Sequence, residues 1–492
     1  MTVSGTTTRS DTASQCSDSE HLAQFDQVRK ILQLQNLPAF ALKIRYGDAV
    51  AADSSCRVVP DPLSGTYHIL FKLEFDDGVH WLLKVPANGY PDAFDAVSAR
   101  ALRSEALTMR LIQRKTKAPV PTVYHFDDTL NNELHCPFIL MEYVDGRPLY
   151  EIWFDQNVDP EVLEKRRCRA LDGVARAMLE LGKFVFDEAG EILFDHNDGP
   201  CCIGPMKMLD IQAMLGQDDD DDDDSTIFCS VGPFRSAKSW FTCMLDRREP
   251  PPDEYSLGVY SVLRLFIDLA FPETQSGEKT DFVLSHPDFD IQNVLVSDDG
   301  SLRSLIDWDG VSTVPRCLGN EVYPSWLTRD WNPVTYTFDE SATPGSDCQN
   351  NHENSPRELE HYRKIYQKLI EKILEFPAAS KRMAANSLVL RNLYIAATDP
   401  VCTHAIVRRI FEEITSRTAP VKSSTEHKGE NGSNNGDNCN NGADSRGDGD
   451  HTHVDEGDDD FFIYDVFTKF RRGNLSERNL QRLTRGFQAL LI

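Results

Sequence analysis

The pattern of apolar and polar positions divides the chain into a strand-rich part and a longer helical part. Between residues 67 and 143, apolar residues alternate with polar ones or form short runs, as is typical of strands. We expect four strands there, at Tyr67–Phe75, His80–Val85, Val123–Phe126 and Phe138–Tyr143. Asp76–Gly78 predicts a tight turn between the first two. Helical spacing predicts one helix before the strands, at His21–Gln35, and one among them, at Ser98–Lys117.

After residue 144 the spacing is mainly helical. Helices are expected at 159–186, 253–271, 358–376, 381–397 and about 400–416, and a helical pattern returns at 461–492. The segment 282–307 interrupts them with short apolar runs that are typical of strands. The chain therefore predicts an α+β fold, in which a small antiparallel sheet precedes a larger, mainly helical region.

Composition changes abruptly at several positions, and these changes predict the domain organisation. We expect a disordered leader at 1–20, an N-terminal lobe at 21–144 and a C-terminal lobe at 145–420. An acidic loop at 216–225 interrupts the second lobe. An acidic linker rich in Asn and Gly should be disordered at 421–460, and a terminal helix should follow at 461–492.

The charge of the chain argues against two classes of partner. Its 492 residues carry a formal net charge of -27, and 40% of them are hydrophobic, enough for a sizeable core. So acidic a chain repels nucleic acid and anionic membrane surfaces, so neither is expected as a partner. Apolar runs also fall short of the roughly 18 residues that suggest a membrane span.

Cysteine usage and the leader predict the compartment. Twelve cysteines are scattered without a CxxC motif, which favours reduced thiols inside the cell. The Ser/Thr-rich leader lacks the apolar stretch of a secretory signal, and its one basic residue, Arg9, argues against mitochondrial import. We therefore expect a cytoplasmic protein.

The most informative stretch is His286–Asn293, which a hairpin and the sequence Ile306–Asp309 follow. Asp288, Asn293 and Asp307 stand at the ends of short apolar runs, and Ser297–Gly300 predicts the hairpin that brings Asn293 and Asp307 together. Amide and carboxylate oxygens are the ligands that Mg²⁺ prefers. Asp288 can then orient an attacking hydroxyl and accept its proton, as phosphoryl transfer requires.

A cation for the phosphates is available in the strand-rich part. Lys84 interrupts an apolar strand, and a buried lysine is costly unless it is paired, so Glu105 on the next helix is its natural partner. An edge-strand lysine that points to solvent is the alternative.

Two further segments complete a possible nucleotide site. Gly65 and Thr66 lie before the first strand, where a glycine permits close approach of phosphate oxygens and a hydroxyl adds a donor. Glu142 and Val144 lie where the chain leaves a strand, so that backbone groups become free to pair with a base. An ordinary turn and a plain strand end are the alternatives for these two segments.

A hydrolytic metal site formed by His286, Asp288 and Asp290 is a rival interpretation. Their spacing suits one face of a strand, but Pro287 disrupts a regular strand, and a second His cluster is missing.

At these residues the chain resembles the aminoglycoside phosphotransferase and choline kinase-like superfamily. The resemblance covers roughly residues 40–415 and is most specific over 281–332; it includes HPDFDIQNVLV, SLIDWDG, PFILMEYVDG and HWLLKVP. It implies a bilobal protein kinase-like fold, Asp288 as the base, and Mg²⁺ held by Asn293 and Asp307. It also implies that Lys84 binds the phosphates of ATP and pairs with Glu105, that 141–144 form the adenine hinge, and that His286 braces the loop.

The chain departs from the family's pattern at Asp290, where antibiotic kinases often have His. A carboxylate there cannot stabilise the γ-phosphate, so it would meet a cationic substrate or weaken catalysis.

We therefore expect an ATP- and Mg²⁺-dependent phosphotransferase that acts on a hydroxyl of a small molecule. The acidic C-terminal lobe favours a cationic acceptor. A catalytically weak or inactive nucleotide-binding protein is the alternative. The acceptor should lie near 309–332, where Trp326 and Trp331 form either pocket walls or core.

Overall fold

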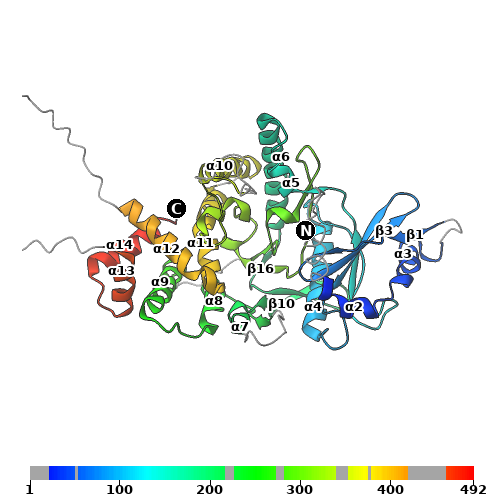
Figure 1. Cartoon of the computed structure of the whole chain (residues 1–492), viewed down its shortest axis with the longest axis horizontal. Helices are drawn as coiled ribbons and strands as arrows, with labels where there is room; N and C mark the ends of the chain where they lie inside the picture. Colours follow the sequence, from blue (N-terminus) through cyan, green and yellow to red (C-terminus); the bar gives the residue numbers. More distant parts are fainter. Residues whose placement is uncertain are drawn as a thin grey trace, which may run out of the picture.

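The computed structural model describes residues 22–49, 54–216, 227–272, 282–339, 353–374, 378–418 and 461–491. The predicted leader, most of the acidic loop at 216–225 and the whole linker at 421–460 lie outside these residues. The molecule is elongated, with the N-terminal sheet at one end and the C-terminal helices at the other (Figure 1). The predicted α+β class is confirmed, whereas the domain boundaries stay predictions.

The N-terminal sheet has six strands in the order β1-β3-β4-β6-β5, with β2 paired to β3, and every pair is antiparallel. The strands are β1 (Cys56–Val58), β2 (Leu63–Ser64), β3 (His68–Phe75), β4 (His80–Pro86), β5 (Val123–Asp127) and β6 (Phe138–Glu142). The β3–β4 turn contains Gly78 at φ 80°, a left-handed conformation that glycine adopts without strain.

Helix α4 (Ala96–Lys115) lies between β4 and β5 in the chain and begins where Asp95 accepts a hydrogen bond from Ser98 N at 2.8 Å. The helix expected at 21–35 is shorter than predicted. Helix α2 covers Asp26–Ile31 and a second helix, α3, covers Leu37–Tyr46. Pro38 suits the first turn of α3, where its missing N–H breaks no helical bond.

The chain leaves β6 and enters the larger region through β7 (Arg147–Pro148), α5 (Leu149–Trp153) and α6 (Pro160–Leu181). Asp159 caps α6. The helix is shorter than the predicted 159–186, because Gly182 ends it and β8 (Val185–Phe186) pairs with β13.

A set of short hairpins between α6 and α9 was not predicted. It consists of β9 (Glu191–Phe194) with β10 (Pro200–Gly204), and β11 (Met206–Leu209) with β12 (Phe228–Val231). Helices α7 (Ile211–Met214), α8 (Ala237–Thr242) and α9 (Glu254–Ala270) accompany them. Each of these strands has only four or five residues, too few for a periodic pattern to predict a strand.

The segment predicted to be strand-rich forms two small sheets. β13 (Phe282–Ser285) pairs with β16 (Ser312–Pro315), and β14 (Val294–Val296) pairs with β15 (Leu302–Leu305) and β7. The hairpin turn at Ser297–Gly300 joins β14 to β15, with Gly300 at φ 84°.

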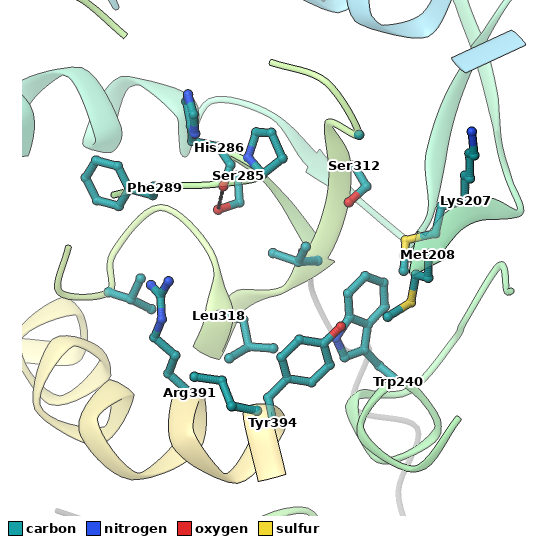
Figure 2. A pocket seen from close by; sticks show the side chains of 16 residues that line it. Lys207, Met208, Trp240, Ser285, His286, Phe289, Ser312, Leu318, Arg391 and Tyr394 are labelled. Carbon is teal, nitrogen blue, oxygen red and sulfur yellow. Dashed lines mark hydrogen bonds between the residues drawn. The ribbon is translucent and has the colours of Figure 1, made fainter. Parts of the chain in front are cut away.

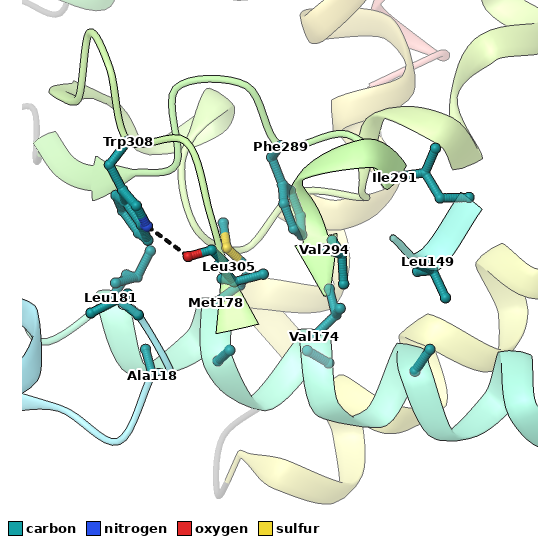
Figure 3. Close-up of a cluster of buried hydrophobic side chains, with 14 of the residues drawn as sticks. Ala118, Leu149, Val174, Met178, Leu181, Phe289, Ile291, Val294, Leu305 and Trp308 are labelled. Carbon is teal, nitrogen blue, oxygen red and sulfur yellow. Dashed lines mark hydrogen bonds between the residues drawn. The ribbon is translucent and has the colours of Figure 1, made fainter. Parts of the chain in front are cut away.

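Apolar side chains of α6 lie beneath this segment. Val174, Met178 and Leu181 are fully buried and lie below Phe289, Val294, Leu305 and Trp308 (Figure 3). Trp308 also donates a hydrogen bond to Leu305 O at 2.9 Å. The loops before and after β14–β15 are therefore anchored on a helix.

The remaining helices are α10 (Pro356–Ile373), α11 (Ala378–Thr398), α12 (Pro400–Thr418), α13 (Ile463–Arg471) and α14 (Glu477–Gln488). Helices α10, α11 and α12 correspond to the helices predicted at 358–376, 381–397 and about 400–416. The single terminal helix predicted at 461–492 is instead two helices, α13 and α14, with Gly473 between them at φ 72°. Helix α13 packs closely on α9, since a Cβ added at Gly258 would lie 2.6 Å from Phe467 O. Within the described part of the chain, we find no helix with the length and apolar character needed to cross a membrane.

Candidate functional site

Asp288 lies in the loop between β13 and a short 3-10 helix, η4 (Ile291–Asn293). Asn293 Nδ2 donates to both Asp288 Oδ2 and Asp288 O at 2.9 Å, and Gln292 Nε2 donates to Asp288 Oδ2 at 3.1 Å. Among the described residues, Asn293 Oδ1 accepts no hydrogen bond, so this oxygen can take a ligand. The structure thus brings Asp288 and Asn293 together.

The electrostatics of the Asp288 carboxyl suit a proton acceptor. Loss of water around it raises its pKa, and the negative charge of Asp290 acts in the same direction. The hydrogen bond from Asn293 opposes this rise. A carboxylate with a raised pKa accepts a proton more readily than an ordinary aspartate.

His286 links the Asp288 loop to the segment before Asp307. Its Nε2 donates to Ile306 O at 2.9 Å, and its ring packs against Trp308 with centroids 4.6 Å apart. Burial lowers the pKa of His286 to about 4, so the ring is neutral at physiological pH. A neutral, buried ring suits a bracing role better than proton transfer.

Asp307 follows β15 in a left-handed conformation, with φ 64°. Ile306 N donates to Asn293 O at 2.9 Å, which holds the two predicted metal ligands close in space. Strained backbone at a non-glycine residue is frequent at functional sites. The carboxylate of Asp307 accepts a hydrogen bond from Lys84 at 3.2 Å, and the charge of Lys84 lowers the pKa of Asp307.

Lys84 and Glu105 form a buried ion pair. Lys84 Nζ donates to Glu105 Oε1 at 2.7 Å, and the two residues are 4% and 3% exposed. Burial works to lower the pKa of Lys84, but the carboxylates of Glu105 and Asp307 outweigh it and keep the ammonium charged. The alternative of an edge-strand lysine that points to solvent is wrong, because β4 lies between β3 and β6.

Sequence reasoning missed His68 and Asp309. Together with Glu105 they form a group of three possible metal ligands, in which one ligand atom from each residue lies within 4.8 Å of those from the other two. His68 lies two residues before Leu70, the partner of Lys84 across β3–β4, so strand alternation could have indicated it. A cation bound by Glu105 would compete with Lys84. The oxygens of Asn293 and Asp307 are therefore the better fit for Mg²⁺.

Gly65 and Thr66 form the turn between β2 and β3. Gly65 N donates to His68 O at 2.9 Å, and Thr66 is exposed. A Cβ added at Gly65 would meet nothing closer than His68 O at 4.0 Å. The fold alone therefore does not require glycine here.

The two residues predicted to form the hinge, Glu142 and Val144, differ in their hydrogen bonds. Glu142 is engaged with Thr122: its N donates to Thr122 O at 2.8 Å, and its carboxylate accepts from Thr122 N and Oγ1 at 3.1 and 2.9 Å. Within the described ranges, the backbone of Val144 makes no hydrogen bond, so its N–H and C=O can pair with a base.

Asp290 is engaged within the protein. Its Oδ1 accepts from Ile291 N at 2.7 Å, and its Oδ2 accepts from Arg329 at 3.2 Å. Arg329 also donates to Glu353 at 2.9 Å. Arg329 and Glu353 were not predicted, because they lie far along the chain from Asp290. These contacts leave little of the Asp290 carboxylate for a cationic substrate.

A pocket of about 330 Å³ adjoins the Asp288 loop. Pro287 and Phe289, on either side of Asp288 in the chain, both line it. The other walls come from β11, α8, β13, β16 and α11, and Figure 2 shows side chains from them converging on the pocket. Trp326 and Trp331 do not line it and are buried in the core.

The chain matches known proteins over much of its length. The phosphotransferase enzyme family matches residues 64–317, more than half of the chain. Altered inheritance of mitochondria protein 9 of Kluyveromyces lactis is 23% identical over 68% of this chain and 60% of its own length. The same-named protein of Candida albicans is 29% identical over 27% of this chain and 21% of its own length. The chain thus matches only part of the length of these relatives.

Two of the solved structures that are similar to this chain are aminoglycoside phosphotransferases. APH(4)-Ia is 15% identical, with a TM-score of 0.38 over 75% of this chain and 97% of its own. APH(2")-IIIa, in a complex with GDP and kanamycin, is 12% identical; the match has a TM-score of 0.37 and covers 77% of this chain and 99% of that one.

One prediction is contradicted. The relatives are named as mitochondrial proteins, which opposes the expected cytoplasmic location. The low basic content of the leader, with Arg9 alone, was a poor guide to location.

The family resemblance is confirmed, and its match includes Lys84, Glu105, Asp288, Asn293 and Asp307. The chain belongs to the phosphotransferase enzyme family.

Proposed function

We propose that this protein transfers the γ-phosphate of ATP to a hydroxyl of a small molecule. One observation carries the proposal: Lys84, from the N-terminal sheet, and Asp307 meet at 3.2 Å beside the loop in which Asn293 holds Asp288. Phosphoryl transfer needs a cation for the phosphates, metal ligands and a base close together.

Each residue has a defined role in this proposal. Lys84 binds phosphate oxygens of ATP, and Glu105 holds its ammonium in place. The Gly65–Thr66 turn covers the phosphates, and the backbone near Val144 receives the adenine. Asn293 Oδ1 and the Asp307 carboxylate would hold Mg²⁺, which neutralises phosphate charge when bound.

Asp288 acts on the acceptor. It takes the proton of the acceptor hydroxyl while that oxygen forms a bond to the γ-phosphorus. The bond from this phosphorus to the bridging oxygen of ADP breaks, and ADP leaves with the electron pair. The pocket beside Pro287 and Phe289 is the proposed acceptor site, because both residues adjoin Asp288 in the chain.

The alternative is a nucleotide-binding protein with weak or no activity. Asp290 favours it, since its carboxylate pairs with Arg329 and cannot stabilise the γ-phosphate. Such a protein would bind ATP and release no ADP with any acceptor.

Nucleotide binding gives the first test. At about 100 times its dissociation constant, a ligand adds about 2.7 kcal/mol to stability. We expect ATP with Mg²⁺ to raise the melting temperature of the full chain, and ATP with a chelator to raise it less. No change at millimolar ATP with Mg²⁺ contradicts the proposal.

The names of the relatives support a mitochondrial location for this protein as well. Fluorescence of the tagged full chain, compared with a mitochondrial marker, tests it. A diffuse signal outside mitochondria would contradict this location.

A further inference from the structure

The charges that line the pocket beside Asp288 are unlike those of the whole chain. Its 16 lining residues include two cations, Lys207 and Arg391, but neither Asp nor Glu. The rest of the wall is mainly apolar, with Trp240 and Tyr394 stacked at 6.0 Å between ring centroids. The net charge of -27 lies largely beyond the pocket, and salt screens exposed charges beyond about 8 Å at physiological ionic strength.

Arg391 is the cation that faces the Asp288 loop. Figure 2 shows its side chain rising from α11 toward the segment of His286 and Phe289. Within the described part of the chain, no hydrogen bond or ion pair within 4.0 Å engages it. Asp288 and Asp290 are the carboxylates whose charges reach its guanidinium.

Neighbouring arginines have partners, which makes Arg391 distinctive. Arg329 contacts Asp290 and Glu353, and Arg363 contacts Asp330 at 2.8 Å. A guanidinium stays charged in proteins, and a half-buried charge without a partner is costly. An anionic ligand in the pocket would remove this cost.

Lys207 is less available for a ligand. Its Nζ lies 3.9 Å from the centre of the Phe228 ring, a cation–π contact that already engages the ammonium. One planar guanidinium matches a carboxylate through two parallel hydrogen bonds. A dianionic phosphate would call for more cations than Arg391 alone.

We infer that the acceptor is an alcohol that bears a carboxylate: Arg391 binds the carboxylate, and the apolar wall at Trp240 and Tyr394 holds the body of the molecule. This inference rests on the proposed function, because the acceptor hydroxyl must reach Asp288. It differs from the expectation of a cationic acceptor, which came from the acidic C-terminal lobe and from Asp290. Arg391 is then a specificity-determining residue.

Three probes of matched shape test the inference: 4-(hydroxymethyl)benzoate, 4-(hydroxymethyl)benzamide and 4-(aminomethyl)benzyl alcohol. They carry a carboxylate, a neutral amide and an ammonium on one aryl alcohol. Their dissociation constants are measured by calorimetry on the full chain, with Mg²⁺ and a non-hydrolysable ATP analogue. We expect the carboxylate to bind roughly 10- to 100-fold more tightly than the amide, as for hydrogen bonds to a charged group. The ammonium probe should bind most weakly.

Variants then assign the preference to Arg391. Arg391→Met keeps length without charge and should bind the carboxylate and the amide equally, whereas Arg391→Lys should keep part of the preference. Arg357→Met removes an exposed arginine of α10 and should leave the preference unchanged. If Arg391→Met does not fold, Arg391→Lys provides the test. Lysine cannot make two parallel hydrogen bonds to a carboxylate, so its preference for the carboxylate probe over the amide probe should be smaller than that of the wild type.

Several results overturn the inference: equal binding of the three probes, tighter binding of the ammonium probe, no binding of any probe, or an unchanged preference in Arg391→Met. The melting shift with ATP and Mg²⁺ is measured on the same samples. If that shift occurs without a carboxylate preference, the inference fails while nucleotide binding stands. If the shift is absent, the proposed function itself fails.

Discussion

Lys84 Nζ lies 3.2 Å from Asp307 Oδ1, although 223 residues separate the two in the chain. Lys84 lies in β4, a central strand of the N-terminal sheet, and Asp307 follows β15 in the segment that is anchored on α6. This contact joins the residue proposed to bind phosphate to one proposed to bind metal. It therefore defines where the phosphates of a nucleotide would lie.

Asp307→Asn should abolish the effect of Mg²⁺ on ATP binding. The amide lacks the charge that holds the metal, but asparagine tolerates the left-handed φ of 64°, so the fold should persist. Melting temperatures with ATP and Mg²⁺ check this. Asp298→Asn, in the exposed β14–β15 turn, is the matched control and should shift like the wild type. An undiminished shift in Asp307→Asn would remove the metal role.

The Lys84–Glu105 pair should behave as a buried pair in a double-mutant cycle. Lys84→Met leaves Glu105 as an unpaired buried carboxylate and should lower the free energy of unfolding by about 3–5 kcal/mol. Adding Glu105→Gln should restore part of this loss without restoring ATP binding. Urea unfolding measures both effects.

The exposed Lys364–Glu360 pair of α10 provides the comparison, since Lys364→Met should cost less than about 1 kcal/mol. Equal costs for Lys84→Met and Lys364→Met would contradict the burial argument.

Gly65→Ala should separate nucleotide binding from folding. A Cβ at Gly65 meets no close neighbour, so stability should change by less than about 1 kcal/mol. If the turn covers phosphates, the added methyl should weaken ATP binding, which calorimetry would detect as a larger dissociation constant. Gly216→Ala, with its nearest contact at 3.6 Å, is the control. Unchanged ATP affinity in Gly65→Ala would show that the turn does not approach the phosphates.

His286 should make the protein less stable in acid. Its pKa of about 4 in the folded chain lies below the ordinary 6.5, so the unfolded chain binds a proton first as the pH falls. Stability should therefore decline between pH 6.5 and about 4, by up to about 3 kcal/mol from this residue.

His286→Gln removes this titration while keeping a donor for Ile306 O, so its stability should fall less over that range. The free energy of unfolding across the pH range is the measurement, and the exposed His196→Gln is the control. Parallel pH profiles for the wild type and His286→Gln would exclude this contribution.

The sequence predicted contacts between residues that lie close together in the chain. The turn at Ser297–Gly300 returns the chain, so the proximity of Asn293 and Asp307 could be foreseen. The cost of burying Lys84 likewise pointed to Glu105, 21 residues later. Contacts made by distant segments could not be foreseen: Arg329 and Arg391 reach the Asp288 loop only through tertiary packing.

The missed elements have a similar explanation. The strands β9–β12 are only four or five residues long, too short for an apolar pattern to identify them as strands. The helix predicted at 21–35 continued an apolar spacing beyond Ile31, where α2 ends, into the short 3-10 turn η1 (Leu34–Asn36) that precedes α3. Apolar spacing alone did not locate that turn.

The most direct test of the account is phosphate transfer that depends on Asp288. Full-length protein is incubated with Mg²⁺, ATP labelled at the γ-phosphate and a filtered extract of small molecules, and label in products other than nucleotide and free phosphate is counted. Asp298→Asn serves as the control. We predict labelled product with the wild type and a rate roughly 10²–10⁴ lower with Asp288→Asn, which should still bind ATP. No labelled product with the wild type, or an equal rate with Asp288→Asn, would contradict the account.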